Sequence, residues 1–596
     1  MILLLALAAA GGGYAGPSAC APCHKEIAAV QRQSNMARTW LPPLPAGYNQ
    51  SRREGGFSYH AQAGPDGVSF TVNGVGGQVE SVVGGERHGV SFLLRLKELD
   101  GVALPRPALL ETRYLHSVKT HGLALSPGFP EETPGTWETG IGRVLSPSFE
   151  KKCLACHGSP AHTATGQAGV DCEICHGPAK AHTVRPPGGV LNPKKLSNSE
   201  SVKLCAQCHS GFSDLVDPLP QDVLISNQAT ALRATECYIQ SNEGLSCTTC
   251  HDPHANSRAE AATVRACLGC HARQAKKAAV CPVNPSADCA RCHMPAVERG
   301  PFVLTDHWIR VVAGTGDRRA ERIRSQVPPR RLFLRILSTT DRAAADQAAG
   351  EGDFFDLARR FSNDPSAGAG GYLGEMWVDQ MDPSLAAAVR RLDYGERTPV
   401  LRKGSNWLVF QRMPRDFRWE AIALEEEGNR LKEKGDLDGA IDRYQKALRI
   451  NPLFARALVF LGVASGQKGD RERAIGVLEQ AAYLFPKDPS AHYNLGIAYG
   501  ASGRAGDEVA AYRRALELEP DLTPAWLNLG AAYLGAKDPS RAMEALERGI
   551  EANPLAVDLY RNLETAYEAA GQMEKARWAS RLIAALTAPS NGAPVP

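Results

Sequence analysis

Fourteen of the sixteen cysteines lie in one short motif, Cys-x-x-Cys-His, which occurs seven times. Two thiols at this spacing can add to the two vinyl groups of one haem ring while the adjacent histidine reaches the iron as an axial ligand. Chance would supply about 0.01 copies at this cysteine and histidine content. The motif therefore predicts seven haems of the c type. In chain order, their attachment residues and proximal ligands are Cys20, Cys23 and His24; Cys153, Cys156 and His157; Cys172, Cys175 and His176; Cys205, Cys208 and His209; Cys247, Cys250 and His251; Cys267, Cys270 and His271; and Cys289, Cys292 and His293.

Paired cysteines can instead bind structural zinc or form a thioredoxin-like redox site. In a zinc site two pairs share one metal, and a histidine need not follow each pair. Every pair in this chain is followed by histidine. The pattern favours haem over both alternatives.

The second axial ligand of each haem decides between electron transfer and catalysis, because an open iron can bind and transform a small molecule. Four histidines outside the motifs are the stronger distal candidates: His88, His182, His254 and His307. Further candidates, with surface or core packing as the alternative, are His60, His116, His121, His162 and Met36. His492 lies far from this region and is interpreted as a surface or packing residue.

Cys237 and Cys281 belong to no motif. In an oxidising compartment such a pair most simply forms a disulfide, with a thiolate ligand or two unpaired thiols as the alternatives.

The segments around the motifs differ in character. Residues 25–152 alternate apolar and polar side chains between turn dipeptides such as Asn73-Gly74 and Asp100-Gly101, which predicts a β-rich part. Residues 153–310 are haem-dense: six motifs fall within residues 153–293. At about 23 residues per haem this part is too small for an apolar core of its own, so the haems must form the core. Together, residues 17–312 are expected to form a heptahaem cytochrome c domain with little regular secondary structure in its second part.

Length, charge and the first residues bound the class of protein. At 596 residues the chain needs several domains, and its formal charge of +3 argues against nucleic acid as a partner. Seven haems with their propionates would bring the charge to about −4. Residues 1–16 are apolar and then rich in small residues, which indicates a signal peptide; a membrane anchor is the weaker alternative. We therefore expect a periplasmic or secreted bacterial protein.

The second half of the chain contains no haem motif. After a charged linker at 313–330, residues 331–414 predict a small α+β domain. Pro452, Pro486, Pro520 and Pro554 are spaced by 34 residues, which is typical of tetratricopeptide repeats and predicts an all-α superhelix over 418–587. Ala440, Ala474 and Ala542 share one position of the repeat, and Glu508 occupies it in the third unit, so looser packing is expected there. A Pro-rich tail, 588–596, is predicted to be disordered.

The haem region resembles the bacterial multihaem cytochromes that carry C-terminal tetratricopeptide repeats. The resemblance covers roughly residues 17–310 and rests on segments such as Cys175-His176-Gly177-Pro178, Cys250-His251-Asp252-Pro253-His254 and Cys292-His293-Met294-Pro295. It implies electron transfer outside the cytoplasm, with distal ligands at His88, His182, His254 and His307.

Residues 331–414 resemble a parvulin-type peptidyl-prolyl isomerase, on Phe354-Phe355-Asp356-Leu357-Ala358 and Gly370-Gly371-Tyr372-Leu373-Gly374. The two pocket histidines that the resemblance implies are replaced by Arg335 and Trp407. Peptide binding or a spacer role is therefore expected in place of isomerase activity.

These features predict an electron carrier that is not itself an enzyme. Its expected partners are redox proteins and a protein or peptide on the repeat surface, with an oligomer or filament also open. One alternative is a multihaem oxidoreductase with one open haem, acting on nitrogen or sulfur oxyanions or on hydroxylamine. A second alternative is a peptide-binding assembly factor.

Overall fold

We analysed a computed structural model of the chain. It describes residues 15–587, except 16, 34–43, 45–46, 65–66, 86–88, 100, 118–119, 127–128, 130, 149, 151–171, 177–178, 185–189, 210–227, 234, 236–237, 239–243, 255–264, 266, 268–293, 295, 300–301, 306, 308, 310–330 and 415–416. The expected signal peptide, the linker, the tail and the Cys237–Cys281 pair lie wholly or almost wholly outside the described residues.

The predicted β-rich part is confirmed as an antiparallel sheet with the order β1-β2-β3-β4-β5-β6-β9, to which β7 and β8 are joined through β5. Its elements are β1 (Asn49–Glu54), β2 (Phe57–Gly64), β3 (Gly67–Val72), β4 (Val75–Gly85), β5 (Gly89–Leu99), β6 (Val102–Thr112), β7 (Tyr114–Ser117), β8 (Gly122–Leu125), α4 (Trp137–Gly140) and β9 (Gly142–Leu145). Asn73 and Gly74 both have positive φ, at 50° and 80°, as a tight hairpin between β3 and β4 requires.

The part in which most of the motifs fall contains short helices and one two-stranded ribbon where it is described. Its elements, with those around the first motif, are α2 (Pro17–Cys20), α3 (Lys25–Arg32), α7 (Cys172–His176), α8 (Lys180–Val184), η1 (Pro193–Lys195), α9 (Asn198–His209), α11 (Gln228–Arg233), α13 (Cys247–Cys250), β10 (Ala296–Arg299) and β11 (Phe302–Thr305). The β-rich boundary at residue 25 was wrong, because residues 25–32 are helical and the sheet begins at Asn49. This segment follows His24 directly and buries Ala28 and Gln31 on one face of the helix.

The α+β domain has a four-stranded antiparallel sheet in the order β13-β12-β15-β14. Its elements are β12 (Arg331–Thr339), α17 (Arg342–Ala349), α18 (Phe354–Phe361), η2 (Pro365–Ala369), β13 (Tyr372–Trp377), η3 (Val378–Gln380), α19 (Pro383–Val389), β14 (Leu401–Lys403) and β15 (Asn406–Arg412). Asp341 and Asp353 cap the two main helices by accepting backbone N–H bonds.

Five antiparallel helix pairs follow, as the 34-residue spacing predicts. They are α20 (Phe417–Glu433), α21 (Leu437–Ile450), α22 (Ala455–Gln467), α23 (Arg471–Leu484), α24 (Pro489–Ala501), α25 (Ala505–Leu518), α26 (Thr523–Gly535), α27 (Pro539–Ala552), α28 (Val557–Ala569) and α29 (Met573–Thr587). At Glu508 the facing residue is Gly500: a Cβ there would lie 2.6 Å from a Glu508 carboxylate oxygen. Because Gly500 has no side chain, the Glu508 side chain fits between the two helices.

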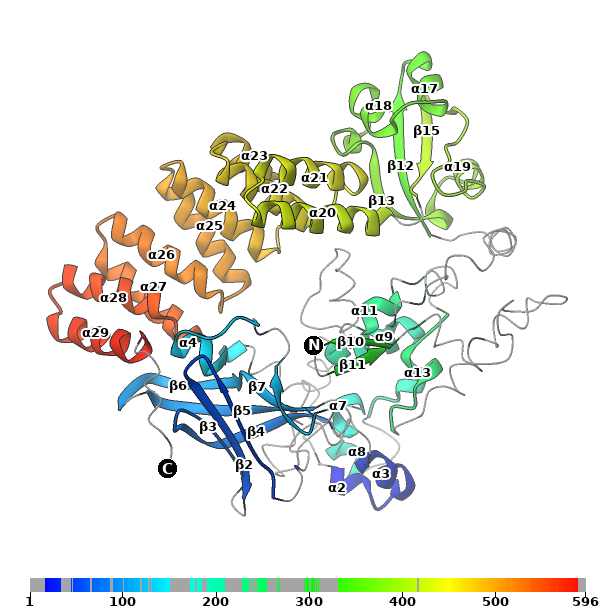
Figure 1. The fold of residues 1–596 in the computed structure, drawn as a ribbon. Coiled ribbons are helices and arrows are strands. Elements are labelled where there is room, and N and C mark those ends of the chain that lie inside the picture. Colours follow the sequence, from blue (N-terminus) through cyan, green and yellow to red (C-terminus); the bar gives the residue numbers. More distant parts are fainter. Residues whose placement is uncertain are drawn as a thin grey trace.

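The repeats form an arc that joins the two ends of the molecule (Figure 1). At one end α21 meets the α+β domain, and at the other α29 contacts α4 and β6 of the N-terminal sheet. One apolar cluster contains Leu110 and Trp137 from the sheet part together with Leu529, Tyr560 and Leu582 from the last repeats. The chain thus folds back so that its last helix packs on its first sheet.

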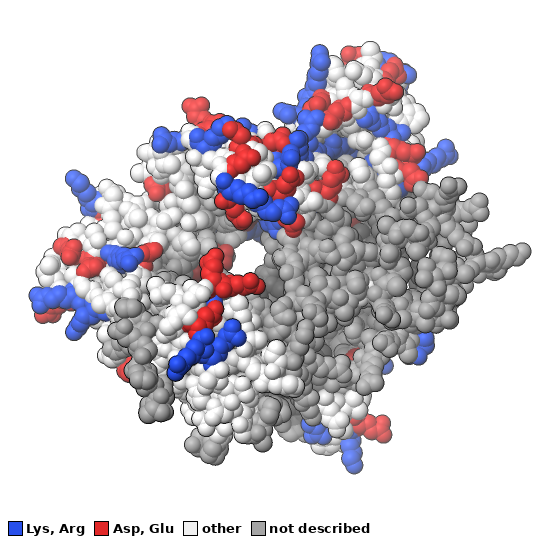
Figure 2. All heavy atoms as spheres, in the orientation of Figure 1, with Lys and Arg blue, Asp and Glu red and all other residues white. Residues whose placement is uncertain are grey.

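Charged side chains of both signs are mixed over the face of the repeats that Figure 2 shows. Neither sign gathers into a continuous patch on this face. Among the helices that the structure describes, none is both long and apolar enough to cross a membrane.

Candidate functional site

Four of the seven expected haem motifs lie wholly within the described residues. The first follows α2, the third forms α7, the fourth ends α9, and the fifth forms α13 and the residue after it, His251. A one-turn helix suits the motif, because thiols three residues apart then lie on the same face. The second cysteines of the first and fourth motifs, Cys23 and Cys208, are exposed, so each can be reached from outside the chain.

The other three expected motifs lie outside the described residues, except for Cys267 of the sixth. They comprise Cys153, Cys156 and His157 of the second motif, Cys270 and His271 of the sixth, and Cys289, Cys292 and His293 of the seventh. Haem attachment at these positions stays a prediction from the sequence.

Three motif histidines each face a histidine from another segment. The ring centres of His24 and His182 are 6.3 Å apart with the ring planes 20° from parallel. The His176–His254 rings are 6.2 Å apart at 19°, and the His251–His307 rings 5.9 Å apart at 26°. Three of the four stronger distal candidates are thus brought to a motif histidine; the fourth, His88, lies outside the described residues.

This spacing fits one metal ion between two imidazoles. A metal–imidazole bond is about 2.0 Å and the ring centre lies about 1.1 Å beyond the nitrogen, so two rings ligating one ion from opposite sides have centres about 6.2 Å apart. Groups of three or more metal-binding side chains are absent from the residues the structure describes. A haem iron needs only two protein ligands, because the porphyrin supplies the other four. The histidine pairs therefore fit haem.

His176 shows how one such ring is oriented. Its Nδ1 lies 2.9 Å from the carbonyl oxygen of Leu191. Since a carbonyl only accepts, Nδ1 carries the proton and Nε2 remains available as a ligand. Burial lowers the pKa of His176, opposed by this hydrogen bond, and the nearby His254 and His24 lower it further. The neutral ring that an iron requires is favoured.

Neighbouring motifs lie close to one another. Helix α2, which carries Cys20, contacts α7 of the third motif. Helix α9 of the fourth motif likewise contacts α13 of the fifth, where the thiols of Cys205 and Cys247 are hydrogen-bonded. Rings attached at these positions would lie side by side.

The weaker distal candidates lie in the sheet part. His60 on β2 has its Nδ1 2.9 Å from the Ser51 hydroxyl, and His116 on β7 is buried edge-on against Tyr48 at 4.9 Å. His121 is exposed at the β7–β8 turn with a φ of 54°. Within the described residues, none of the three has a ring contact with a motif histidine. Met36 and His162 lie outside the described residues, and His492 in the repeats is half-buried, with its Nε2 3.2 Å from the carbonyl oxygen of Pro486.

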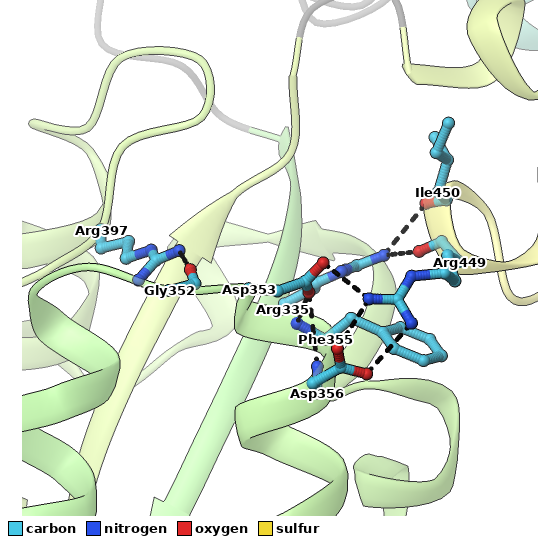
Figure 3. Close-up of polar contacts among 8 residues, drawn as sticks. All are labelled: Arg335, Gly352, Asp353, Phe355, Asp356, Arg397, Arg449 and Ile450. Carbon is cyan, nitrogen blue, oxygen red and sulfur yellow. Dashed lines mark hydrogen bonds and ion pairs between the residues drawn. The ribbon is translucent and has the colours of Figure 1, made fainter. Parts of the chain in front are cut away.

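A second site surrounds Arg335 in the α+β domain, where the resemblance places a pocket histidine (Figure 3). Arg335 is 6% exposed, and its Nη2 donates to the carbonyl oxygens of Arg449 and Ile450 at the end of α21. Burial lowers its pKa to about 10. A protonated guanidinium thus fills this position and binds the end of a repeat helix.

Arg449, at the end of α21, also binds the α+β domain. Its guanidinium binds Asp353 at 2.7 Å and Asp356 at 2.8 Å, and lies over the ring of Phe355 (Figure 3). Sequence reasoning missed the contact of these residues with Arg449, because nothing local relates α18 to a helix that begins more than 70 residues later. The face of α18 next to Arg335 is therefore covered by the repeats.

Trp407, the second replacement of an expected pocket histidine, lies apart from Arg335 on the sheet. In the β12–β15 ladder Arg335 pairs with Gln411, whereas Trp407 pairs with Thr339 at the other end. Trp407 instead packs beneath Arg342, whose guanidinium lies 4.6 Å from the ring centre. The two replacements serve separate packing contacts.

Family models match the second half of the chain. A "PPIC-type PPIASE domain" matches residues 336–413, a "TPR repeat" matches 428–469, and a "Tetratricopeptide repeat" matches 466–523 and 523–554. These confirm the parvulin-like domain and the repeats, and they indicate modules for protein docking or peptide binding. No curated protein matches.

Solved structures match over little more than a quarter of the chain. A MamA protein is 27% identical, with 28% of this chain and 90% of that chain covered and a TM-score of 0.26. YrrB, described as a TPR protein with an unusual peptide-binding site, is 22% identical over 28% and 86%, with a TM-score of 0.25. A tetratricopeptide repeat protein from Parabacteroides merdae is 20% identical over 28% and 66%, with a TM-score of 0.26.

Proposed function

We propose that this protein transfers electrons outside the cytoplasm through seven covalently bound c-type haems. The main support for this proposal is the sequence. It contains seven complete Cys-x-x-Cys-His motifs and has fifteen of its sixteen histidines in residues 1–310. Covalent attachment places each ring and its proximal ligand at a fixed position on the chain. The periplasm or the exterior of a bacterial cell is the compartment we propose.

The close spacing of the motifs supports transfer along a series of haems. Six motifs occupy residues 153–293, so the rings would fill the interior of that region and lie near one another. The contacts of α2 with α7 and of Cys205 with Cys247 support such proximity. Electron hopping requires this closeness, whereas an isolated catalytic haem does not.

The rear half supplies docking in this proposal. The parvulin-like domain has an arginine bound to the repeats where a pocket histidine is expected, which supports a structural role over isomerisation. Both ends of the repeat arc are engaged within the molecule. A redox partner or peptide would bind the repeat surface between those ends, where Tyr483 is 84% exposed.

The test is a haem count by pyridine haemochrome with EPR of the oxidised protein. We expect seven haems per chain, all low-spin, which are reduced and reoxidised in several steps. A stoichiometric high-spin signal that shifts with nitrite or hydroxylamine would support the oxidoreductase alternative instead. A chain without haem after expression with the attachment machinery would contradict the proposal.

A second candidate is a peptide-binding assembly factor, and the family matches taken alone favour it, because they fall only in the peptide-handling half. The two proposed functions differ in whether the protein needs its haems to act. If alanine replaces all fourteen motif cysteines and the folded chain still binds and matures its partner protein, the haems are dispensable and the second candidate holds.

A further inference from the structure

We infer that His182, His254 and His307 are the distal ligands of the first, third and fifth haems, respectively. Each would bind the iron opposite His24, His176 and His251. The inference rests on the proposed haem attachment and adds to it the partner of each iron, which the sequence alone leaves open. It also gives the order in which these three haems follow one another.

The three pairs share one geometry. Their ring-centre distances span 5.9–6.3 Å and their tilts 19–26°, around the value of about 6.2 Å expected for two imidazoles on one metal ion. Each pair joins one motif histidine to one histidine outside the motifs, as proximal and distal ligands require. The His116–Tyr48 pair shows the different result of ordinary packing, with rings 4.9 Å apart and nearly perpendicular.

The chain connects these pairs in a regular sequence. His182 lies six residues after His176, and His254 lies three residues after His251. The segment that supplies the proximal ligand of the third haem therefore continues into the distal ligand of the first haem. The segment of the fifth haem does the same for the third.

This connection sets the path of the electron. Segments of three and six residues span at most about 10 and 20 Å, so consecutive irons in the series must lie close together. The contact of α2 with α7 agrees with this for the first and third haems. The structure assigns a relay through the first, third and fifth haems, with the fourth beside the fifth, where α9 contacts α13.

The test replaces each distal histidine in the full holoprotein. We expect His182→Ala, His254→Ala and His307→Ala each to keep seven haems by pyridine haemochrome and to convert one low-spin haem in seven to a high-spin haem by EPR. Added imidazole should restore the low-spin signal. The control is His492→Ala, a repeat histidine far from every motif in the sequence, which should leave seven low-spin haems.

A double variant tests the pairing itself. Removing the first haem by Cys20→Ala and Cys23→Ala should leave six haems, and adding His182→Ala should then produce no high-spin signal. A high-spin haem in that combination would show that His182 serves another iron and would overturn the assignment. If His182→Ala fails to fold, His182→Met should keep six-coordinate iron and raise one midpoint potential.

The outcomes separate the two levels of the argument. A wild-type chain without haem contradicts the proposed function. Seven haems that stay low-spin in all three alanine variants contradict the ligand assignment and leave electron transfer standing.

Discussion

Arg335 is both buried and charged, so it requires hydrogen-bond acceptors around it. A buried guanidinium is costly unless acceptors satisfy it, and the carbonyl groups at the end of α21 are acceptors that lack partners within their own helix. The partial negative charge at a helix C-terminus adds to the attraction. Arg335 thus connects the parvulin-like domain to the repeats, at a position where the resemblance implies a catalytic histidine.

We predict that Arg335→His does not create isomerase activity. The position is covered by Arg449 and Ile450, so a peptide cannot reach an imidazole placed there. Proline isomerisation of a short peptide should stay at the uncatalysed rate, while stability falls by about 1–3 kcal/mol through loss of charge-assisted hydrogen bonds. Measurable catalysis by this single variant would show that the site opens in solution.

Glu508 gives a second prediction at this scale. Burial raises its pKa, so the folded state binds a proton more readily than the unfolded state, whose pKa is near 4.5. Stability contributed by the protonated form is present below that value and is lost as pH rises through the folded pKa. Glu508→Ala should therefore raise the thermal midpoint of the repeats at pH 7, and the gain should shrink at pH 4.

The control for this prediction is Glu517→Ala, which removes an exposed carboxylate of the same helix. It should change the midpoint little at either pH. An equal gain at pH 4 and pH 7 for Glu508→Ala would show that helix propensity, rather than titration, is the cause.

At the scale of elements, α21 attaches the parvulin-like domain to the repeats through several contacts. Phe333, Tyr372 and Phe417 form an apolar cluster with Ile450 beside Arg335. Arg449 adds ion pairs to Asp353 and Asp356 at the start of α18, where acidic side chains also favour the helix dipole. The apolar cluster gives affinity, and the charges fix orientation.

We predict that Arg449→Ala loosens this attachment at neutral pH and that its effect fades as the pH falls below about 4. Burial opposes ionisation of Asp353, but the hydrogen bond and charge of Arg449 outweigh it and lower its pKa. A depressed folded pKa contributes stability that is present above the unfolded pKa and lost as pH falls through the folded value. Because the side chains are half exposed, the effect should be about 0.5–1 kcal/mol.

Hydrogen exchange of α18 and α21 measures this change in the full chain. Faster exchange in the variant at pH 7, with matching rates at acid pH, is the expected result after correction for intrinsic exchange. Arg561→Ala, which breaks an exposed pair with Asp558 on α28, is the matched control. Equal effects of both variants would mean that the attachment does not depend on Arg449.

Elements with local signals could be predicted from the sequence. The Asn73-Gly74 turn and the 34-residue proline spacing identified the hairpin and the helix pairs, because turn geometry and repeat packing depend on neighbours along the chain. The helix at residues 25–32 lacked such a signal. The pairing of His182 with His24 was also beyond reach, because 158 residues separate them and only the folded chain brings them together.

At the scale of the whole molecule, the repeats join the parvulin-like domain at one end to the N-terminal sheet at the other (Figure 1). The second contact has an apolar centre and a polar edge, where Asp521 accepts a hydrogen bond from the Ser148 backbone N–H at 2.9 Å. The half-buried Arg106 on β6 lies near enough to Asp521 and Glu551 to interact with both charges. The last repeats thereby hold the N-terminal sheet in place.

We predict that Asp521→Ala weakens the contact between the repeats and the N-terminal sheet. The substitution removes the acceptor for Ser148 and leaves the half-buried Arg106 with less compensating charge, which should cost about 1–3 kcal/mol at the contact. Burial opposes ionisation of Asp521, but hydrogen bonds from Ser146 and Ser148 outweigh it and lower its pKa. The wild-type contact should accordingly hold above about pH 4 and weaken below it.

Limited proteolysis and small-angle scattering of the full chain test this prediction together. The variant should show a larger radius of gyration at pH 7 and faster cleavage near α29, while haem content and spin state stay unchanged. Asp558→Ala, which removes an exposed carboxylate of α28, should leave both measurements at wild-type values. If Asp521→Ala also leaves them unchanged, the apolar cluster alone holds the sheet to the repeats, and separating them would require an apolar substitution such as Leu582→Asp in α29.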